Sequence, residues 1–246
     1  MANLRSQLRL FDNLNSLSLA AAELFVQSAA RATVEHGRFL VALSGGTTPT
    51  ELYELLAQLP YRAKIDWEHL HAFWGDERCV PIDDLENNYR QARDTLLSRV
   101  RLPSQNIHRI ESGLEPDQAA EDYARVLKRF STPPLDWPRF DLVLLGMGED
   151  GHTASLFPGS EVNVSSPTLA VTAYYQNRPA SRVTLTPVVF NSARRIIFLV
   201  SGESKSQTLA NVLYGGHQPE QLPAQRIQPT DGELIWMVDQ TAASKF

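Results

Sequence analysis

Short, almost wholly apolar segments alternate along the chain with longer segments of helical periodicity. The apolar run 39–43 predicts a strand buried on both faces, and the amphipathic stretch 16–36 predicts a helix ending at Gly37, a residue typical of helix C-termini. We predict further strands at residues 8–11, 70–74, 140–145, 169–173, 196–200 and 234–238. Further helices are predicted from residue 49 and over residues 88–100, 117–130 and 204–214.

Apolar strands separated by helices are typical of a mostly parallel sheet that is covered on both faces. We therefore predict an α/β fold of the doubly wound type, a three-layer, Rossmann-like arrangement that forms a single domain over residues 1–246. The proline-rich segment 132–138 leads directly into a predicted strand, so we interpret it as a loop rather than a domain boundary.

The composition narrows the class of protein. A hydrophobic content of 43% excludes disorder, 13 glycines exclude a collagen-like chain, and the single cysteine, Cys79, excludes a disulfide framework. The net charge of −5 offers no overall attraction to nucleic acid or an anionic membrane, so an anionic ligand needs a local cluster of cations. With no apolar run of signal-peptide or membrane-spanning length, we expect a soluble, cytoplasmic protein.

Doubly wound sheets bind ligands outside the carboxyl ends of their strands, where four loops of this sequence carry unusual residues. In the first loop, glycines permit a sharp turn and hydroxyls add donors before a helix that begins near Pro49, with a capping-box pattern at Thr48 and Glu51. Such a turn suits an anion, although an ordinary strand-to-helix turn explains it too. The residues concerned are Ser44, Gly45, Gly46 and Thr47.

The second loop follows the predicted strand 70–74. It places Asp76, Glu77 and Arg78 in succession, with Asn88 a short distance beyond. Three consecutive charges after an aromatic strand indicate either a ligand or a solvated turn with an Asp–Arg pair. Cys79 could act as a nucleophile, but a small buried thiol is the favoured interpretation.

The third loop, at 144–158, is the most informative, because it presents Asp150 and His152 at a strand end. Its Gly-x-Gly-x-x-Gly pattern resembles a dinucleotide site, yet Pro158 leaves room for only a short helix and residues 162–202 contain no acid to hold a ribose. A histidine suits proton transfer near neutral pH, so His152 is a candidate acid/base, with a purely structural histidine as the alternative.

The fourth loop, 200–205, places Lys205 near the first turn of a helix, where the helix dipole disfavours a cation unless an anion is bound. An excess of arginine upstream indicates an anion-facing side, or else a chance cluster on a solvated surface; it consists of Arg178, Arg182, Arg194 and Arg195. His69 and His71 share one face of a strand, but no third ligand accompanies them, and we predict no metal site.

Taken in order, these loops resemble the 6-phosphogluconolactonase family over nearly the whole chain. The related amino-sugar phosphate deaminases usually continue from the Asp-Gly-His core toward Asn-Glu-Pro, whereas this chain continues with Ser-Leu-Phe-Pro at 155–158. The resemblance rests on the motifs LSGGTTP at 43–49, WGDER at 74–78, NNY at 87–89, GMGEDGHTASLFP at 146–158, RVTLT at 182–186 and SGESK at 201–205.

The resemblance implies hydrolysis of 6-phospho-D-glucono-1,5-lactone to 6-phosphogluconate in the oxidative pentose phosphate pathway, without a cofactor. It makes His152 the general base, with Asp76 or Asp150 orienting its imidazole. Backbone amides around residues 148–151 are the expected oxyanion donors. The expected substrate-binding residues are Ser44, Gly45, Gly46, Thr47, Arg78, Asn88, Gly148, Gly151, Arg182 and Lys205.

Two other functions stay open at this point. One is an amino-sugar-phosphate deaminase or isomerase, and the other is a sugar-phosphate sensor without catalytic activity. The acidic charge and the lack of a helix-turn-helix argue against the sensor. The oligomeric state and the preference among phosphosugar lactones are not predicted.

Overall fold

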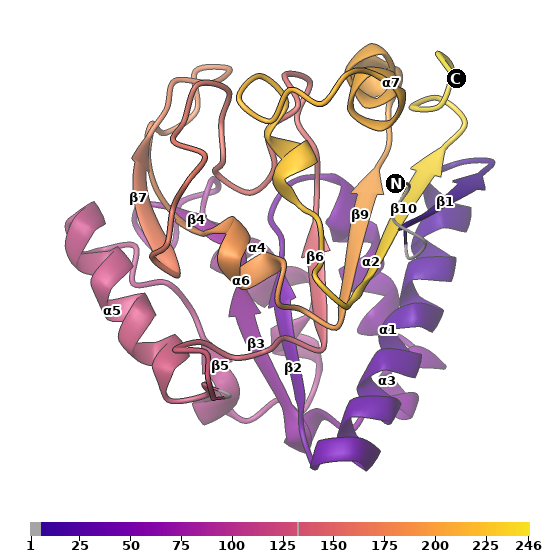
Figure 1. Ribbon diagram of the computed structural model, residues 1–246. Coiled ribbons are helices and arrows are strands. Elements are labelled where there is room, and N and C mark those ends of the chain that lie inside the picture. Colours follow the sequence, from indigo (N-terminus) through magenta and orange to yellow (C-terminus); the bar gives the residue numbers. More distant parts are fainter. Residues whose placement is uncertain (1–5, 132) are drawn as a thin grey trace.

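The computed structural model describes residues 6–131 and 133–246. Its centre is a seven-stranded sheet in the order β1-β10-β9-β6-β2-β3-β5, in which every pair of neighbours is parallel (Figure 1). Its strands in chain order are β1 (Ser6–Phe11), β2 (Phe39–Leu43), β3 (Leu70–Trp74), β5 (Ile107–His108), β6 (Leu142–Leu145), β9 (Arg195–Val200) and β10 (Glu233–Asp239). The predicted doubly wound α/β fold is thereby confirmed.

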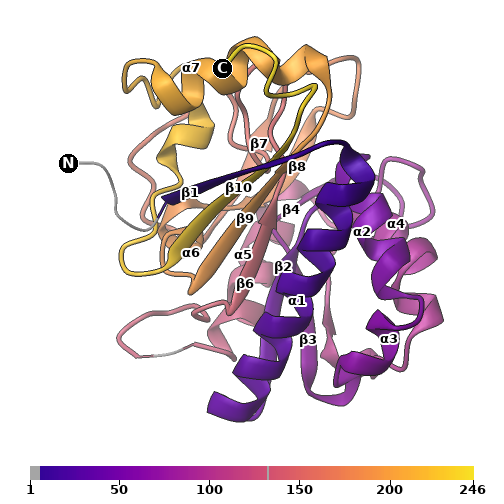
Figure 2. The same cartoon turned by 90° about the vertical axis from the view of Figure 1, so that its right-hand side faces the viewer.

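Helices flank this sheet on both faces. Figure 2 shows α1, α2 and α3 grouped on one side of it. The helices are α1 (Leu14–His36), α2 (Thr48–Leu56), α3 (Tyr61–Lys64), α4 (Asn88–Thr95), α5 (Pro116–Lys128), α6 (Pro187–Phe190) and α7 (Ser206–Tyr214). Single 3-10 turns occur at Trp67–His69, Leu97–Arg99, Ser104–Asn106, Glu203–Lys205 and Pro223–Arg226. No helix within the described ranges is long and apolar enough to cross a bilayer.

A second, antiparallel sheet of three strands was not predicted. It consists of β4 (Asp76–Arg78), β8 (Ser181–Leu185) and β7 (Thr168–Thr172) in the order β4-β8-β7, so the predicted strand at 169–173 lies outside the parallel sheet. The short charged β4 resembles a turn in sequence. It forms a strand because, after a bend at Gly75, the chain pairs with β8.

Burial explains why the predicted elements form. All five residues of β2 are buried between neighbouring strands, as their apolar run indicates. Helix α1 begins with a capping box between Asn13 and Ser16 and ends at Gly37 in the left-handed region, with φ of 74°. Its buried face includes Leu17, Phe25 and several alanines that pack close to the sheet.

Two predicted helix boundaries need correction. The capping box at Thr48 and Glu51 does not form, because α2 already begins at Thr48 and Thr47 makes no side-chain cap bond; Glu51 accepts from Asn15 instead. The helix predicted over 88–100 ends at Thr95, where Leu96 leaves the helical region. In the proline-rich loop, Thr132 lies outside the described residues, and 133–138 connects α5 to the chain entering β6.

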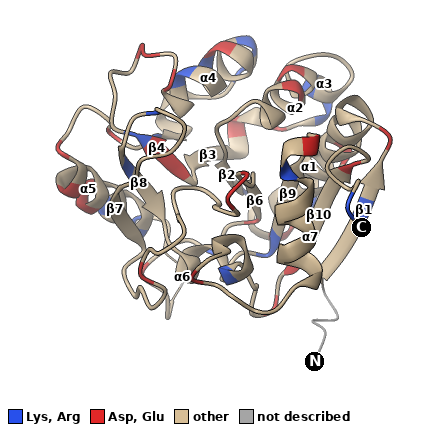
Figure 3. Cartoon of the chain, turned by 90° about the horizontal axis from the view of Figure 1, so that it is seen from above, with Lys and Arg blue, Asp and Glu red and all other residues tan. Residues whose placement is uncertain are grey.

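The order of the strands determines where a ligand can bind. Strands β2 and β6 are neighbours within the sheet. Strands β3 and β5 extend it beyond β2, and strands β9, β10 and β1 extend it beyond β6. Connections therefore diverge between β2 and β6, which leaves a crevice at their carboxyl ends. Figure 3 looks onto this edge of the sheet, with β4 and α7 on opposite sides of β2 and β6.

Candidate active site

A pocket of about 520 Å³ lies at the carboxyl ends of β2, β3, β6 and β9 and contains residues from all four predicted loops. Of the predicted site residues, only Asp150 and Gly151 do not line it directly. Those that do are Ser44, Gly45, Gly46, Thr47, Asp76, Arg78, Asn88, Gly148, His152, Arg182 and Lys205.

His152 is held by Asp150, two residues before it. The imidazole Nδ1 lies 2.6 Å from Asp150 Oδ1, which also accepts from the His152 amide at 3.1 Å. Although burial opposes the effect, the hydrogen bond and the charge of His152 hold the pKa of the Asp150 carboxyl below its ordinary value. A carboxylate at Nδ1 favours the tautomer in which Nε2 is the free acceptor.

Gly148 is required beneath the imidazole. A Cβ added at this position would lie 2.2 Å from the Cε1 and Nδ1 atoms of His152 and 2.8 Å from Asp150 Oδ1. Phe157 stacks on the imidazole at 4.4 Å between ring centroids. The ring of His152 thus occupies a space that any side chain at 148 would fill.

Asp76 does not bond to this histidine. Its Oδ2 accepts from the buried Ser155 hydroxyl at 2.7 Å, and its Oδ1 lies 3.4 Å from Asn88 Nδ2. Asn88 Oδ1 in turn accepts from Arg78 Nη1 at 3.0 Å. Of the two carboxylates considered from the sequence, only Asp150 contacts the imidazole, and Asn88 connects Asp76 with Arg78.

Glu77 holds the backbone next to Arg78 and Asn88 in place, although nothing in the sequence distinguishes it from its charged neighbours. Its carboxylate is 1% exposed and accepts from the amides of Arg78, Asn88 and Tyr89 at 2.7–2.8 Å. Burial raises its pKa to about 7, against the opposing effect of these three amides. Since two of the amides belong to the first turn of α4, Glu77 fastens α4 to β4.

The glycine loop is fixed at both ends. Tyr53 donates to the Ser44 carbonyl at 2.7 Å and accepts from the Ser44 amide at 3.0 Å. The Gln91 amide group contacts both backbone groups of Gly46. No larger residue fits at position 45, because a Cβ there would lie 1.9 Å from Asn88 Oδ1. Side chains of α2 and α4 thus hold the loop in place.

Two cations of the pocket are shielded from solvent, Arg182 fully and Lys205 in part. Arg182 is 3% exposed, and its Nη2 has no hydrogen-bond partner within the described part of the chain. Burial lowers its pKa and also that of Lys205, which directly precedes α7 as predicted. Arg78 and Arg182 are register partners across β4 and β8, so two like charges face each other. This arrangement favours an anion between them.

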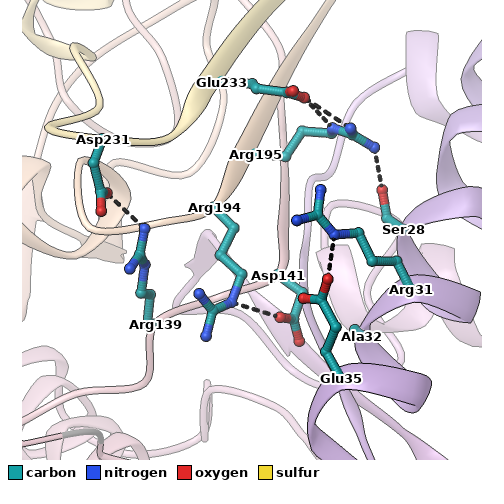
Figure 4. A pocket seen from close by; sticks show the side chains of 10 residues that line it. All are labelled: Ser28, Arg31, Ala32, Glu35, Arg139, Asp141, Arg194, Arg195, Asp231 and Glu233. Atoms are coloured by element: carbon teal, nitrogen blue, oxygen red, sulfur yellow. Dashed lines mark hydrogen bonds and ion pairs between the residues drawn. The ribbon is translucent and has the colours of Figure 1, made fainter.

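Part of the expectation about the third loop, and part of that about the arginines, is wrong. The amides of Gly148 and Gly151 are not free for an oxyanion, because they donate to the carbonyls of His152 and Gly148 and so hold the loop together. Arg194 and Arg195 lie in another pocket, of about 350 Å³, beside the amino ends of β9 and β10, where they pair with Asp141 and Glu233 (Figure 4). Only Arg178 and Arg182 of the predicted cluster reach the first pocket.

The remaining candidates have ordinary surroundings. Burial raises the pKa of the Cys79 thiol to about 11, which does not suit a nucleophile. His69 contacts Asp66 at 2.8 Å, whereas His71 contacts His108 at 3.1 Å, so the two imidazoles do not share a ligand site.

Sequence reasoning missed Tyr175 and underrated Arg178, which both line the pocket from the connection between β7 and β8. Neither residue follows a strand of the parallel sheet. An aromatic residue and an arginine in a polar connection carry no signal of their own in the sequence.

Comparison with known proteins agrees with this geometry. A sequence profile described as "Glucosamine-6-phosphate isomerases/6-phosphogluconolactonase" matches residues 12–236. The chain belongs to this family. Within the family, the 6-phosphogluconolactonase of Synechocystis sp. is 42% identical over 218 residues, which cover 88% of each chain. The resemblance predicted from the loop motifs is thereby confirmed.

Solved structures of the family share the fold. The 6-phosphogluconolactonase of Thermotoga maritima is 29% identical, with a TM-score of 0.82 and coverage of 96% of this chain and 100% of that one. A monomeric glucosamine-6-phosphate deaminase is 20% identical, with a TM-score of 0.84 and coverage of 98% and 100%. The likeness to the deaminase shows a shared fold alone, and the residues of the site, rather than the fold, indicate the reaction.

The contact between Gly148 and His152 can be tested without an activity assay. We expect Gly148→Ala to lower the free energy of unfolding by about 1–3 kcal/mol and to shift the imidazole NMR resonances of His152, because the added methyl group displaces the ring. Gly113→Ala is the control, since its Cβ would meet no atom within 4 Å. Unchanged resonances and stability in Gly148→Ala would contradict the packing described.

Proposed function

We propose that the protein hydrolyses 6-phospho-D-glucono-1,5-lactone to 6-phosphogluconate, the reaction for which its relatives from Synechocystis sp. and Thermotoga maritima are named. The observation that carries this proposal is the His152–Asp150 pair in a pocket that also holds the buried guanidinium of Arg182, whose Nη2 has no hydrogen-bond partner among the described residues. The pair supplies a base, and the guanidinium supplies a site for phosphate.

The chemistry needs one base that later becomes an acid. His152 Nε2 takes a proton from a water molecule as the water oxygen attacks the lactone carbonyl carbon. The tetrahedral intermediate then collapses, the bond from that carbon to the ring oxygen breaks, and the imidazolium returns the proton to the departing oxygen. Water and lactone give the hydroxy acid, and no cofactor is consumed. Asp150 stabilises the imidazolium between these two steps.

The phosphate of the substrate binds among the cations that line the pocket. Arg182 and Lys205 are cations whose burial is unfavourable without an anion, and a phosphate dianion would offset that cost. Arg78 adds a second guanidinium opposite Arg182. The hydroxyls and amides of the 44–47 loop lie at the beginning of α2, where the helix dipole attracts negative charge.

We propose that residues 1–246 form one lactonase domain. A cytoplasmic location and a place in the oxidative pentose phosphate pathway remain predictions that follow from the sequence and the resemblance. They do not bear on the chemistry of the pocket.

The reaction and its base are tested by following the lactone by NMR after generating it in situ. Wild type should accelerate its loss over buffer, which hydrolyses the lactone unaided, and His152→Ala should lower kcat by about 10²–10⁴-fold with a modest change in KM. A folded wild type no faster than buffer would overturn the lactonase proposal, and ammonia release from glucosamine 6-phosphate would then support a deaminase. Full turnover by His152→Ala would remove this residue as the base.

The two carboxylates are distinguished by a pair of matched variants. Asp150→Asn should lower kcat by about 10²-fold or more and move the acid limb of the pH–rate profile to lower pH, because a neutral amide no longer stabilises the imidazolium. Because the pKa of Asp150 is already held low, this carboxylate itself does not titrate near neutral pH. Asp76→Asn should leave the acid limb in place, since Asp76 contacts Ser155 and Asn88. The reverse pattern would assign the orienting role to Asp76.

The phosphate site is tested by KM. Lys205→Met and Arg182→Gln should each raise KM by about 10–100-fold, equivalent to the ~1.5–3 kcal/mol of a charged hydrogen bond, with kcat within a few-fold of wild type. Arg194→Gln is the matched control, because Arg194 lies in the other pocket. Turnover of unphosphorylated glucono-1,5-lactone should be insensitive to all three changes. Equal losses with both lactones would place the phosphate elsewhere.

A further inference from the structure

The connection between β7 and β8 crosses the pocket and reaches the imidazole. Tyr175 presents its ring to His152 at 4.6 Å between centroids and 76° between planes, an edge-to-face contact. On the same imidazole, Phe157 stacks at 4.4 Å and 28°. One aromatic ring from the same loop and one from the connection between β7 and β8 therefore enclose the imidazole of His152.

This connection is anchored on both sides of the pocket. On the His152 side, the Tyr175 hydroxyl accepts from the Glu149 amide at 3.3 Å, and Gln176 Nε2 lies 3.4 Å from Glu149 Oε2. On the opposite side, Arg178 Nη1 donates to Glu86 Oε2 at 2.8 Å. Its tip turns through positive φ at Gln176 and Asn177. Tyr175 is thus fixed relative to the 146–158 loop by contacts other than its own ring.

From these contacts we infer that Tyr175 is a positioning residue for the general base His152. This inference rests on the proposed lactone hydrolysis. It adds a residue that neither the sequence motifs nor the hydrogen-bonding partner of the imidazole indicates.

The physical need for such a residue follows from the geometry. Asp150 holds only one ring atom, Nδ1, and a single hydrogen bond leaves the imidazole free to tilt about that atom. Phe157 limits the tilt on one face, and the edge contact with Tyr175 limits it on another side. A base aligned within a few tenths of an ångström of the attacking water is the condition for efficient proton transfer.

The hydroxyl and the ring of Tyr175 have separable tasks. The ring contacts the imidazole, whereas the hydroxyl contacts the backbone of Glu149. Tyr175→Phe keeps the first contact and removes the second, and Tyr175→Ala removes both. Tyr174 is the matched control because it is the adjacent tyrosine, 91% exposed and outside the pocket.

The experiment measures kcat and KM for the full chain with the phosphorylated lactone, together with the thermal midpoint of each variant. We expect Tyr175→Ala to lower kcat by about 10–100-fold with KM within about threefold of wild type, as loss of alignment without loss of binding requires. Tyr175→Phe should restore kcat to within about threefold of wild type. Tyr174→Ala should match wild type, and the imidazole resonances of His152 should shift in Tyr175→Ala alone.

Three outcomes would overturn the inference. Tyr175→Ala with wild-type kcat and unshifted His152 resonances would show that the ring has no positioning effect. A rise in KM at constant kcat would make Tyr175 a substrate contact, and an equal loss of kcat in Tyr175→Phe would assign the effect to the hydroxyl. Failure of wild type to hydrolyse the lactone would instead overturn the proposed function, and the NMR shift would still report whether the ring holds the imidazole.

Discussion

Gly75 joins the parallel and the antiparallel sheet, and this junction positions residues that line the pocket. Its amide donates to the Leu43 carbonyl at the end of β2, and its carbonyl accepts from Leu185 of β8, both at 2.8 Å. One residue therefore ends pairing in the parallel sheet and begins pairing in the antiparallel one. Because of this junction, the charges of β4 and β8 lie beside the loops that follow β2 and β6 rather than in solvent.

Hydrogen bonds within the 146–158 loop determine much of its shape. Its own amides satisfy its own acceptors: Gly148 donates to His152, Gly151 to Gly148, and His152 to Asp150. The cost is an unusual backbone, with positive φ at Gly151 and at Ala154. The His152–Asp150 pair is consequently preorganised by hydrogen bonds within the loop, and Tyr175 adds contacts from outside it.

Much of the fold could be predicted because buried parallel strands are apolar throughout and helices are periodic, as in β2 and α1. The charged β4 could not, since only its pairing with β8 makes it a strand. The pairing of Asp150 with His152 could be predicted from the sequence because the two residues are only two positions apart. The sequence alone could not decide between Asp150 and Asp76, because both follow strands at the same edge of the parallel sheet and differ only in what their carboxylates contact. It also could not separate Arg182 from Arg194, because that distinction depends on which end of the sheet each residue lies beside.

The facing arginines of β4 and β8 also affect the stability of the folded protein. Arg78 lies opposite Arg182 across two paired strands, an arrangement that is unfavourable for like charges, and Glu86 Oε2 lies 3.6 Å from Arg78 Nε. A phosphate bound as proposed would reduce the repulsion, and the native state would gain free energy in the presence of the ligand. The abundance of the folded protein in a cell would then rise with the supply of the molecule that it consumes, a form of homeostasis that requires no separate regulatory site.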